Sequence, residues 1–318
     1  MEDIKRCLYC YNELEEDSIS DYHPKCSKKF FGSAIAPVLS ISGPELEEMA
    51  LTIIKRSMTI PGVQPKLSLN IEPNQNDPKK SRLTVVGLWS NYILKPQSPS
   101  YKALPENEDL TMKLAELAGI ATAEHSLVRT SSGTLAYITK RFDRLKSSKV
   151  PVEDLCQLSE LPSSAKYDSS MEKTGKTVSK YSSAPGFDAI SFFEIALFSF
   201  LTGNADMHLK NFSIIKNEEN QYRLSPAYDL LSTAIALPSD KEQMALTLNG
   251  KKNRINKKDF KLFAEKLKID DSIAEKIMSK QLNRFGEFES LIKISFLPTE
   301  MKNQYVDLLR ARINSLKD

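Results

Sequence analysis

Apolar residues are spaced along the chain in different ways, and each spacing predicts a different kind of element. The stretch 187–201 is apolar on nearly every side, as buried helices are, and Gly203 follows it where helices commonly end. Polar and apolar residues alternate in 67–71, which predicts a strand. Apolar residues recur at helical spacing in 43–56 and over much of 257–315. The chain therefore combines helices with strands.

The first half of the chain contains further stretches that favour strands. We expect these strands at 83–89, 91–96, 122–129 and 134–139, with the first two paired. A helix is expected over 109–118, opened by 105–108 and closed by Gly119. The stretch 163–185 is rich in Ser, Thr, Lys and Gly, which indicates a mobile loop over the mouth of a cleft or a disordered insert.

Three oxygen-bearing side chains follow the apolar helix in a fixed order: Asp206, Asn211 and Asp229. Two short strands, 211–216 and 221–225, are expected to form a hairpin that returns Asp229 to the side of Asn211 and Asp206. Phosphoryl transfer from a magnesium nucleotide uses such a set. One group orients the attacking hydroxyl and accepts its proton, and two hold hard cations that bridge the phosphates.

The same residues have a plainer interpretation. Asp206 and Asn211 alone are consistent with a loop and a helix cap, and Asp229 with a surface acid, because an aspartate five positions before an asparagine is common by chance. A buried helix, a loop, a hairpin and a second aspartate in series favour the catalytic interpretation.

Lys95 ends a predicted strand, where its ammonium would reach nucleotide phosphates, and Glu108 opens the next helix. A strand lysine followed by a helix acid allows an ion pair to position the lysine, and Glu106 is the second choice of acid. The loop 56–66 would present backbone N–H groups to phosphates, although it equally reads as a helix-to-strand connector. Its candidate contacts to the nucleotide are Gly62, Val63 and Gln64, and its modifiable hydroxyls belong to Ser57 and Thr59.

These features predict an α+β, bilobal, protein-kinase-like fold with a small sheet-rich N-lobe and a larger helical C-lobe. The expected domains are a small N-terminal cap over 1–40, a kinase N-lobe over 41–142 and a kinase C-lobe over 143–318. The strand that runs into 140–144 suits a hinge between lobes, with Phe142 as a candidate apolar contact to adenine.

Composition limits the number of domains, the class of partner and the cellular location that we expect. The chain has 318 residues, enough for one large domain or two lobes, and its net charge of +3 is too small to argue for direct nucleic-acid or membrane binding. The sequence shows no run of about 18 apolar residues and no apolar N-terminal segment of a secretory signal. Four cysteines do not suggest a disulfide scaffold, so a cytoplasmic location is the default, with delivery by a dedicated secretion system left open.

A second set of candidate ligands lies near the N-terminus. The residues Cys7, Cys10, His23 and Cys26 have the spacing C-x2-C-x12-H-x2-C, which is consistent with a structural Zn²⁺ held by three thiolates and one imidazole. The alternative is a set of reduced thiols in a small N-terminal cap.

Together these landmarks resemble the HipA-like toxin kinases, serine/threonine kinases of bacterial toxin–antitoxin systems. The motifs that carry the resemblance are Ile60-Pro-Gly-Val-Gln-Pro-Lys66, Tyr92-Ile-Leu-Lys95, Asn107-Glu108, Arg141-Phe-Asp-Arg144, Gly203-Asn-Ala-Asp-Met-His-Leu-Lys-Asn-Phe-Ser213 and Tyr228-Asp229. They occur in family order. The chain is short for the family and lacks the extra N-terminal subdomain of full-length HipA. In this it is similar to the HipT type, in which a separate small protein supplies that part.

The resemblance implies a role for each site residue. Asp206 would be the catalytic base, Asn211 and Asp229 the Mg²⁺ ligands, and Lys95 a contact to ATP phosphates, while His208 would brace the catalytic loop. Lys140, Arg141 and Phe142 would offer hinge contacts to adenine, and Asp143 would reach the ribose, although Lys140 stands where the family usually has an acid.

The resemblance also implies autophosphorylation at Ser57 and Thr59, where HipT proteins carry a Ser-x-Ser-like motif. It implies aminoacyl-tRNA synthetases as substrates, with the tryptophanyl and glutamyl enzymes as candidates, and small antitoxins of the HipB and HipS type as partners.

Two other functions remain open from sequence. A small-molecule kinase of the antibiotic or choline type also uses an aspartate, an asparagine five positions on and a later aspartate, but the Gln-Pro-Lys loop argues against it. A nucleotide-silent, kinase-like module that binds a partner protein is the third possibility, and the presence of all three catalytic side chains argues against permanent inactivity.

Overall fold

We describe a computed structural model of the chain, in which the described residues are 4–56, 66–74, 77–86, 89–145 and 148–317. The chain divides into two compact units, which we describe separately. Unit 1 comprises Met1–Asp109, Ala123–Phe142 and Ile294–Phe296, and unit 2 comprises Leu110–Thr122, Asp143–Lys293 and Leu297–Asp318.

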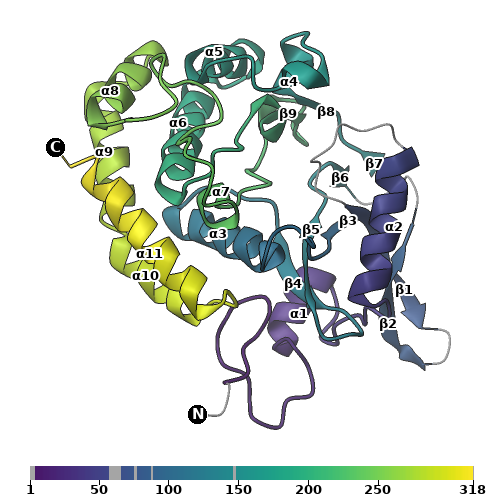
Figure 1. Cartoon of the computed structure of the whole chain (residues 1–318). Helices are drawn as coiled ribbons and strands as arrows, with labels where there is room; N and C mark the ends of the chain where they lie inside the picture. Colours follow the sequence, from purple (N-terminus) through teal and green to yellow (C-terminus); the bar gives the residue numbers. More distant parts are fainter. Residues whose placement is uncertain (1–3, 57–65, 75–76, 87–88, 146–147, 318) are drawn as a thin grey trace. The chain divides into compact units, whose positions relative to one another are not determined.

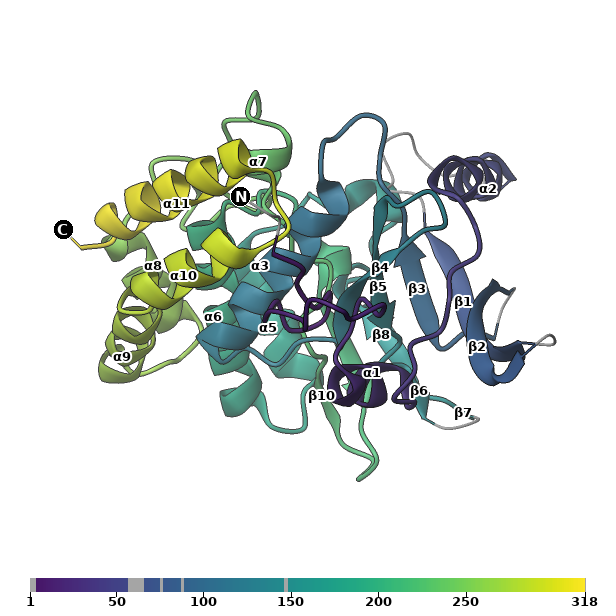
Figure 2. The same cartoon turned by 90° about the horizontal axis from the view of Figure 1, so that it is seen from below.

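Unit 1 is built on a five-stranded antiparallel sheet in the order β2-β1-β3-β5-β4, and Figure 2 shows the strands side by side in this order. The strands are β1 Leu67–Asn74, β2 Asp77–Val85, β3 Tyr92–Lys95, β4 His125–Arg129 and β5 Leu135–Lys140. The helices of this part are α1 Pro24–Phe31, α2 Gly43–Arg56 and the first turns of α3 Leu104–Ala118.

We expected the strand at 83–89 to pair with the strand at 91–96. This pairing is wrong, because β1 lies between the corresponding strands β2 and β3. Leu69 is opposite Val85 of β2 on one side and Tyr92 of β3 on the other. The sequence gives the strands but not their neighbours, since a short connection between two strands does not require them to pair.

The core of unit 1 joins the N-terminal segment to the sheet. Phe30 and Phe31 of α1 pack edge-on against each other with their ring centroids 4.8 Å apart, and both rings lie against Tyr92 of β3. Leu8 and Leu127 belong to the same buried cluster. Burial of these side chains therefore makes the N-terminal segment part of the sheet's core.

Unit 2 is organised around α6 Pro185–Thr202, which packs against α5 Met171–Tyr181, α9 Asp271–Leu282 and α11 Thr299–Asn314 (Figure 1). Its other elements are β6 Arg144–Leu145, β7 Ser148–Lys149, β8 Val152–Asp154, α4 Leu155–Leu158, η1 Ser163–Ala165, η2 Leu209–Asn211, β9 Ser213–Lys216, β10 Tyr222–Leu224, α7 Thr233–Ala236, α8 Lys257–Lys266 and α10 Phe285–Ile294. β8, β9 and β10 form an antiparallel sheet in the order β10-β9-β8.

The apolar character of α6 is explained by an aromatic core. Phe193 stacks on Phe263 of α8 with ring centroids 5.6 Å apart, and Phe198 meets Phe288 of α10 edge-on. By length and composition α6 is the one helix of the described residues that would span a membrane, yet 67% of it is buried within the protein. That burial is the pattern of a helix at the centre of a folded unit.

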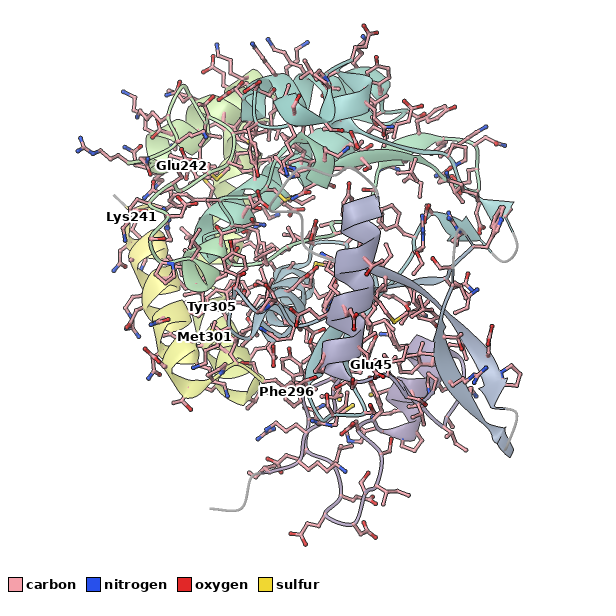
Figure 3. The ribbon with its side chains drawn as sticks, turned by 45° about the vertical axis from the view of Figure 1, so that its right-hand side comes forward. Glu45, Lys241, Glu242, Phe296, Met301 and Tyr305 are labelled. Atoms are coloured by element: carbon pink, nitrogen blue, oxygen red, sulfur yellow. The ribbon has the colours of Figure 1, made fainter. Side chains whose placement is uncertain are left out.

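A contact along α11 joins the early and late parts of unit 2. The hydroxyl of Tyr305, which Figure 3 labels on α11 together with Met301, lies 2.8 Å from Thr111 Oγ1 of α3. Both groups are buried, so each satisfies a polar atom that would otherwise be costly to bury.

The expectation of a mobile or disordered segment at 163–185 is wrong for most of its length. It contains α5, whose first turn is capped by the Ser170 side chain accepting from the Lys173 N–H at 3.2 Å. Gly175 of α5 lies so close to its neighbours that a Cβ would stand 2.2 Å from Leu267 Cδ2 and 3.2 Å from Phe192. The missing side chain at 175 allows α5 to pack, and the local composition does not reveal this.

We predict that Gly175→Ala destabilises unit 2 by about 1–3 kcal/mol, because overpacking a closed interface outweighs the better helix propensity of alanine. Gly186→Ala is the matched control, since Gly186 is also helical but has no atom within 4 Å of the added Cβ. Urea unfolding of the two variants measures the difference, and equal free energies of unfolding would contradict the packing of α5.

Candidate active site

The loop after α6 begins at a position that only glycine suits. Gly203 adopts a left-handed conformation with φ of 67°, and a Cβ there would lie 2.8 Å from both Ala234 Cβ and Leu308 Cδ2. The α6 axis therefore ends sharply, and the chain turns into the stretch that contains Asp206.

Side-chain caps hold the backbone around Asp206. The Asp206 N–H donates to Asn204 Oδ1 at 3.1 Å, and the Ala205 N–H donates to Thr233 Oγ1 at 2.8 Å. The Thr233 hydroxyl in turn donates to the Gly203 carbonyl at 3.0 Å. These bonds leave the Asp206 carboxylate partly exposed on a loop whose backbone is fixed at several points.

Asn211 is held against this loop in a defined orientation. Its Nδ2 donates to the Asp206 carbonyl oxygen at 2.9 Å, and the His208 N–H donates to the same oxygen at 2.8 Å. Because a carbonyl only accepts, the amide nitrogen must face Asp206 and Oδ1 takes the opposite side of the carboxamide. Asn211 is 6% exposed, so its oxygen is presented from a rigid position.

Asp229 returns to the loop through the expected hairpin of β9 and β10. The hydroxyl of the preceding Tyr228 donates to the Lys210 carbonyl at 2.9 Å and lies 2.6 Å from Ser213 Oγ. Tyr228 therefore ties the residue before Asp229 to the residue before Asn211. Asp229 itself has a φ of 60°, a conformation that costs a non-glycine residue about 1 kcal/mol or more.

The charges of both aspartates act on the pKa of His208. Its pKa is lowered, chiefly because the ring is buried, while the nearby carboxylates of Asp206 and Asp229 act in the opposite direction. The imidazole is therefore neutral at pH 7. The His208 backbone N–H, which donates to the Asp206 carbonyl oxygen, helps to hold the loop.

Tyr167 contacts the candidate base and was not predicted. Its hydroxyl donates to Asp206 Oδ1, and its ring meets the His208 ring edge-on at 5.0 Å. Burial raises the pKa of Tyr167, and the neighbouring Asp206 raises it further, so the hydroxyl keeps its proton and remains a donor. No sequence signal marks a tyrosine 39 positions upstream as a partner of Asp206.

Unit 1 contains a separate pair of charged side chains. Lys95 Nζ at the end of β3 lies 2.6 Å from Glu108 Oε1 in α3, with Lys95 8% exposed and Glu108 fully buried. The ammonium also lies 5.6 Å from the centre of the Tyr137 ring. Glu106 is the second choice of acid. Burial raises the pKa of its carboxyl to about 7, so it is partly protonated at neutral pH.

The four residues expected at the hinge are Lys140, Arg141, Phe142 and Asp143. The Lys140 side chain forms an ion pair with Glu124 and donates to the Lys29 carbonyl at 3.2 Å. Asp143 Oδ2 lies 2.5 Å from Arg144 Nη1. The Arg141 backbone N–H donates to a carbonyl within unit 1, and Phe142 is partly buried. The side chains of Lys140 and Asp143 are therefore engaged in local ion pairs.

Two further groups of predicted residues complete the site inventory. Ser57, Thr59, Gly62, Val63 and Gln64 lie outside the described residues. The side chains of the N-terminal cluster, in contrast, are brought together. The ligand atoms of Cys7, Cys10, His23 and Cys26 all lie within 4.8 Å of one another.

Comparison with known proteins places this geometry in context. The family model of the HipA-like C-terminal domain matches residues 58–287. The chain is 28% identical over 248 residues to a candidate kinase of Sinorhizobium fredii, Y4mE, covering 74% of this chain and 56% of that protein. It is 29% identical over 216 residues to the serine/threonine-protein kinase toxin HipA of Shewanella oneidensis, covering 60% of this chain and 47% of that protein. The chain thus spans about half the length of these relatives.

The fold is similar to a solved structure. HipA in the complex of HipA, HipB and operator DNA from Shewanella oneidensis MR-1 matches with a TM-score of 0.66 and 22% identity, covering 84% of this chain and 70% of that one. The expectation of an α+β, kinase-like fold is thereby confirmed.

The convergence of the two aspartates on His208 is testable without any assay of activity. We predict that His208 titrates below the ordinary value of about 6.5, and that both Asp206→Asn and Asp229→Asn lower its pKa further, because each removes a charge that favours the imidazolium. The chain has 3 histidines, so NMR titration resolves each ring.

The same shift links His208 to stability. Because the unfolded chain takes up the proton first, the contribution of the neutral ring to the free energy of unfolding is lost as pH falls through about 6.5 towards the lower folded pKa.

The control for the NMR titration is Asp307→Asn, on an exposed part of α11, which should leave the pKa of His208 unchanged. An unaltered His208 pKa in Asp229→Asn would place Asp229 away from the loop.

Proposed function

Because the chain belongs to the family of HipA-like C-terminal domains, we propose that it is an ATP- and Mg²⁺-dependent serine/threonine protein kinase. The observation that carries the proposal is a pair of hydrogen bonds in unit 2: Asn211 donates to the Asp206 carbonyl, and Tyr228, the residue before Asp229, donates to the carbonyl of the residue before Asn211. Their donors are two carboxylates and an amide oxygen, which is the hard set that Mg²⁺ prefers, and the fixed Asn211 orientation suits a metal ligand.

In this proposal each side chain of unit 2 has one task. Asp206 orients the substrate hydroxyl and accepts its proton as the hydroxyl oxygen bonds to the γ-phosphorus and the bond to the β–γ bridging oxygen breaks, releasing ADP. Asn211 Oδ1 and the Asp229 carboxylate would hold the cation. Bound Mg²⁺ supplies positive charge to the phosphate oxygens. Tyr228 is a positioning residue, because it acts only through the backbone that it ties together.

Unit 1 would supply the phosphate contact. The buried Glu108 fixes the Lys95 ammonium by a charge-assisted hydrogen bond, which leaves the lysine in one orientation for the nucleotide phosphates. Backbone groups of Arg141 and Phe142 would contact adenine, since the Lys140 side chain is held by Glu124. The residues Gly62, Val63 and Gln64 would cover the phosphates, and Asp143 would reach the ribose.

The finer parts of the proposal follow from the resemblance to toxin kinases. They are a role as the toxin of a toxin–antitoxin system of the HipT type, autophosphorylation at Ser57 and Thr59, an aminoacyl-tRNA synthetase as substrate, antitoxins of the HipB and HipS type as partners, and a cytoplasmic location. A structural Zn²⁺ in the Cys/His cluster completes the set of proposed cofactors.

One contact favours a second candidate, the nucleotide-silent binding module. The Tyr167 hydroxyl occupies Asp206 Oδ1, the atom that a substrate hydroxyl would approach. In a working kinase this tyrosine must give way to the substrate, whereas in a silent module it would remain in place.

We predict that Asp206→Asn lowers phosphoryl transfer by about 10²–10⁴-fold, the usual contribution of a general base. Asp229→Asn should fall at least as far, because it weakens the cation site while asparagine tolerates the left-handed backbone. Transfer of radiolabelled phosphate from ATP to the protein measures both, with Asp307→Asn as the control. Undiminished labelling in the two variants would refute the assignment.

We predict that Tyr167→Phe raises kcat/KM for a protein substrate by about tenfold or more, the equivalent of one net hydrogen bond to a charged group. Tyr181→Phe, a partly exposed tyrosine in the same segment, is the control and should have no effect. A loss of activity in Tyr167→Phe would show instead that the hydroxyl positions Asp206 for catalysis.

A further inference from the structure

We propose that Cys7, Cys10, His23 and Cys26 bind one Zn²⁺, and that this zinc-closed segment fixes the first turn of α3 and thereby the Lys95–Glu108 pair. All residues involved belong to unit 1. The metal site stands on its own geometry, and only its effect on ATP binding rests on the proposed kinase function.

The two distances from His23 to cysteine sulfurs match a tetrahedral site, and all four ligand atoms lie within 4.8 Å of one another. His23 Nδ1 lies 3.4 Å from Cys10 Sγ and 3.8 Å from Cys26 Sγ. Tetrahedral ligands at the usual Zn–S distance of about 2.3 Å and Zn–N distance of about 2.0 Å stand about 3.5–3.8 Å apart. Three thiols and one imidazole are a soft donor set that selects zinc over magnesium or calcium.

The tautomer of His23 is fixed in the form that a metal requires. Nε2 lies 3.0 Å from the Glu13 carbonyl oxygen, and a carbonyl only accepts, so Nε2 must carry the proton. Nδ1 then bears the lone pair, and this is the nitrogen that faces the two thiols. A ligand histidine whose second nitrogen donates to a backbone carbonyl is the usual arrangement around bound zinc.

The segment has little regular secondary structure to hold its fold. Between residues 4 and 23 the described structure contains turns and one isolated bridge, Arg6 to Glu13, and no helix or strand. The reversal is closed by the Tyr11 N–H donating to the Cys7 carbonyl at 2.9 Å, with Tyr11 at a left-handed φ of 64°. Leu8, Leu14 and Tyr22 are buried in the core of unit 1, and a bound metal would add its own free energy to that burial.

Tyr11 connects this segment to α3. It follows Cys10 directly, its side chain is fully buried, and its hydroxyl donates to Asp109 Oδ2 at 2.6 Å. Its ring meets Phe296 edge-on at 5.1 Å. The conformation at Cys10 therefore determines where the Tyr11 hydroxyl lies.

Asp109 links the position of the Tyr11 hydroxyl to the Lys95–Glu108 ion pair. Its second oxygen, Oδ1, is 2.7 Å from His125 Nδ1 of β4, so the carboxylate is held from both sides. Asp109 is the neighbour of Glu108 in α3, and Glu108 holds Lys95. A buried carboxylate that lost the Tyr11 hydroxyl would seek another partner, and the first turn of α3 would shift with it.

The metal content of the purified 318-residue chain tests the site. Mass spectrometry should find about one zinc per chain, and Co²⁺ substitution should give the absorption bands of a tetrahedral thiolate site. Cys10→Ser should lose the metal, whereas Cys156→Ala, a cysteine outside the cluster, should keep it. A folded chain with no zinc, or with a disulfide between two of the cluster cysteines, would overturn the assignment.

Hydrogen exchange tests the connection to α3 independently of kinase activity. Chelation of the metal, and Tyr11→Phe with its metal retained, should both speed exchange in residues 104–109. Tyr22→Phe is the control, because Tyr22 is a buried tyrosine of the same segment whose hydroxyl donates to Leu127 of β4 and not to α3. Unchanged exchange at 104–109 in Tyr11→Phe would refute the connection.

ATP affinity separates the two proposals. Tyr11→Phe should weaken ATP binding by about tenfold, one charge-assisted hydrogen bond, with the zinc content unchanged. If the unaltered chain binds no ATP, the proposed function fails while the zinc site and its effect on exchange stand. If ATP binds equally to both proteins, the kinase proposal stands and the influence of zinc on the lysine is excluded.

Discussion

The close approach of Gly203 to α7 and α11 is the constraint on which the candidate active site depends. With no side chain at 203, the carbonyl of this residue accepts from Thr233, and the same threonine accepts from Ala205, so the turn is closed before Asp206. The Asp206 carbonyl then accepts hydrogen bonds from the Asn211 side chain and the His208 backbone N–H. A bulkier residue at 203 would push α6 away from Ala234 and Leu308, and every later bond in the loop would move with it.

The elements with strong local signals could be predicted from sequence. The apolar helix 187–201, the hairpin that returns Asp229, and a lysine on a strand before an acidic helix start depend on spacing within a short stretch. The contacts that matter most could not be predicted, because they join distant residues. Tyr11 and Asp109 are 98 positions apart and Tyr167 and Asp206 are 39 apart. The packing of α5 through Gly175 was missed for the same reason, since its partner surface belongs to α6 and to residue 267.

The two units present candidate metal ligands of opposite chemistry. The cluster in unit 1 has three thiols and an imidazole, while the set in unit 2 has carboxylate and amide oxygens. Because thiolates select soft ions and carboxylates select hard ones, one protein would hold a permanent structural ion and an exchangeable catalytic ion without competition between them. The positions of Lys95 and Asp206 thus depend on separate supports, the segment with the proposed zinc site in one case and a capped turn in the other.

The Tyr305–Thr111 bond has a consequence for biosynthesis. Residues 110–122 leave the ribosome early, yet they are part of a unit whose packing is completed by α11, almost two hundred positions later. Until α11 emerges, the aromatic surface of α6 has no full cover and the loop at 203 lacks the neighbour Leu308. The nascent chain therefore cannot complete the packing around Gly203 until α11 has been made, so the loop that follows α6 is among the last parts of unit 2 to gain its neighbours.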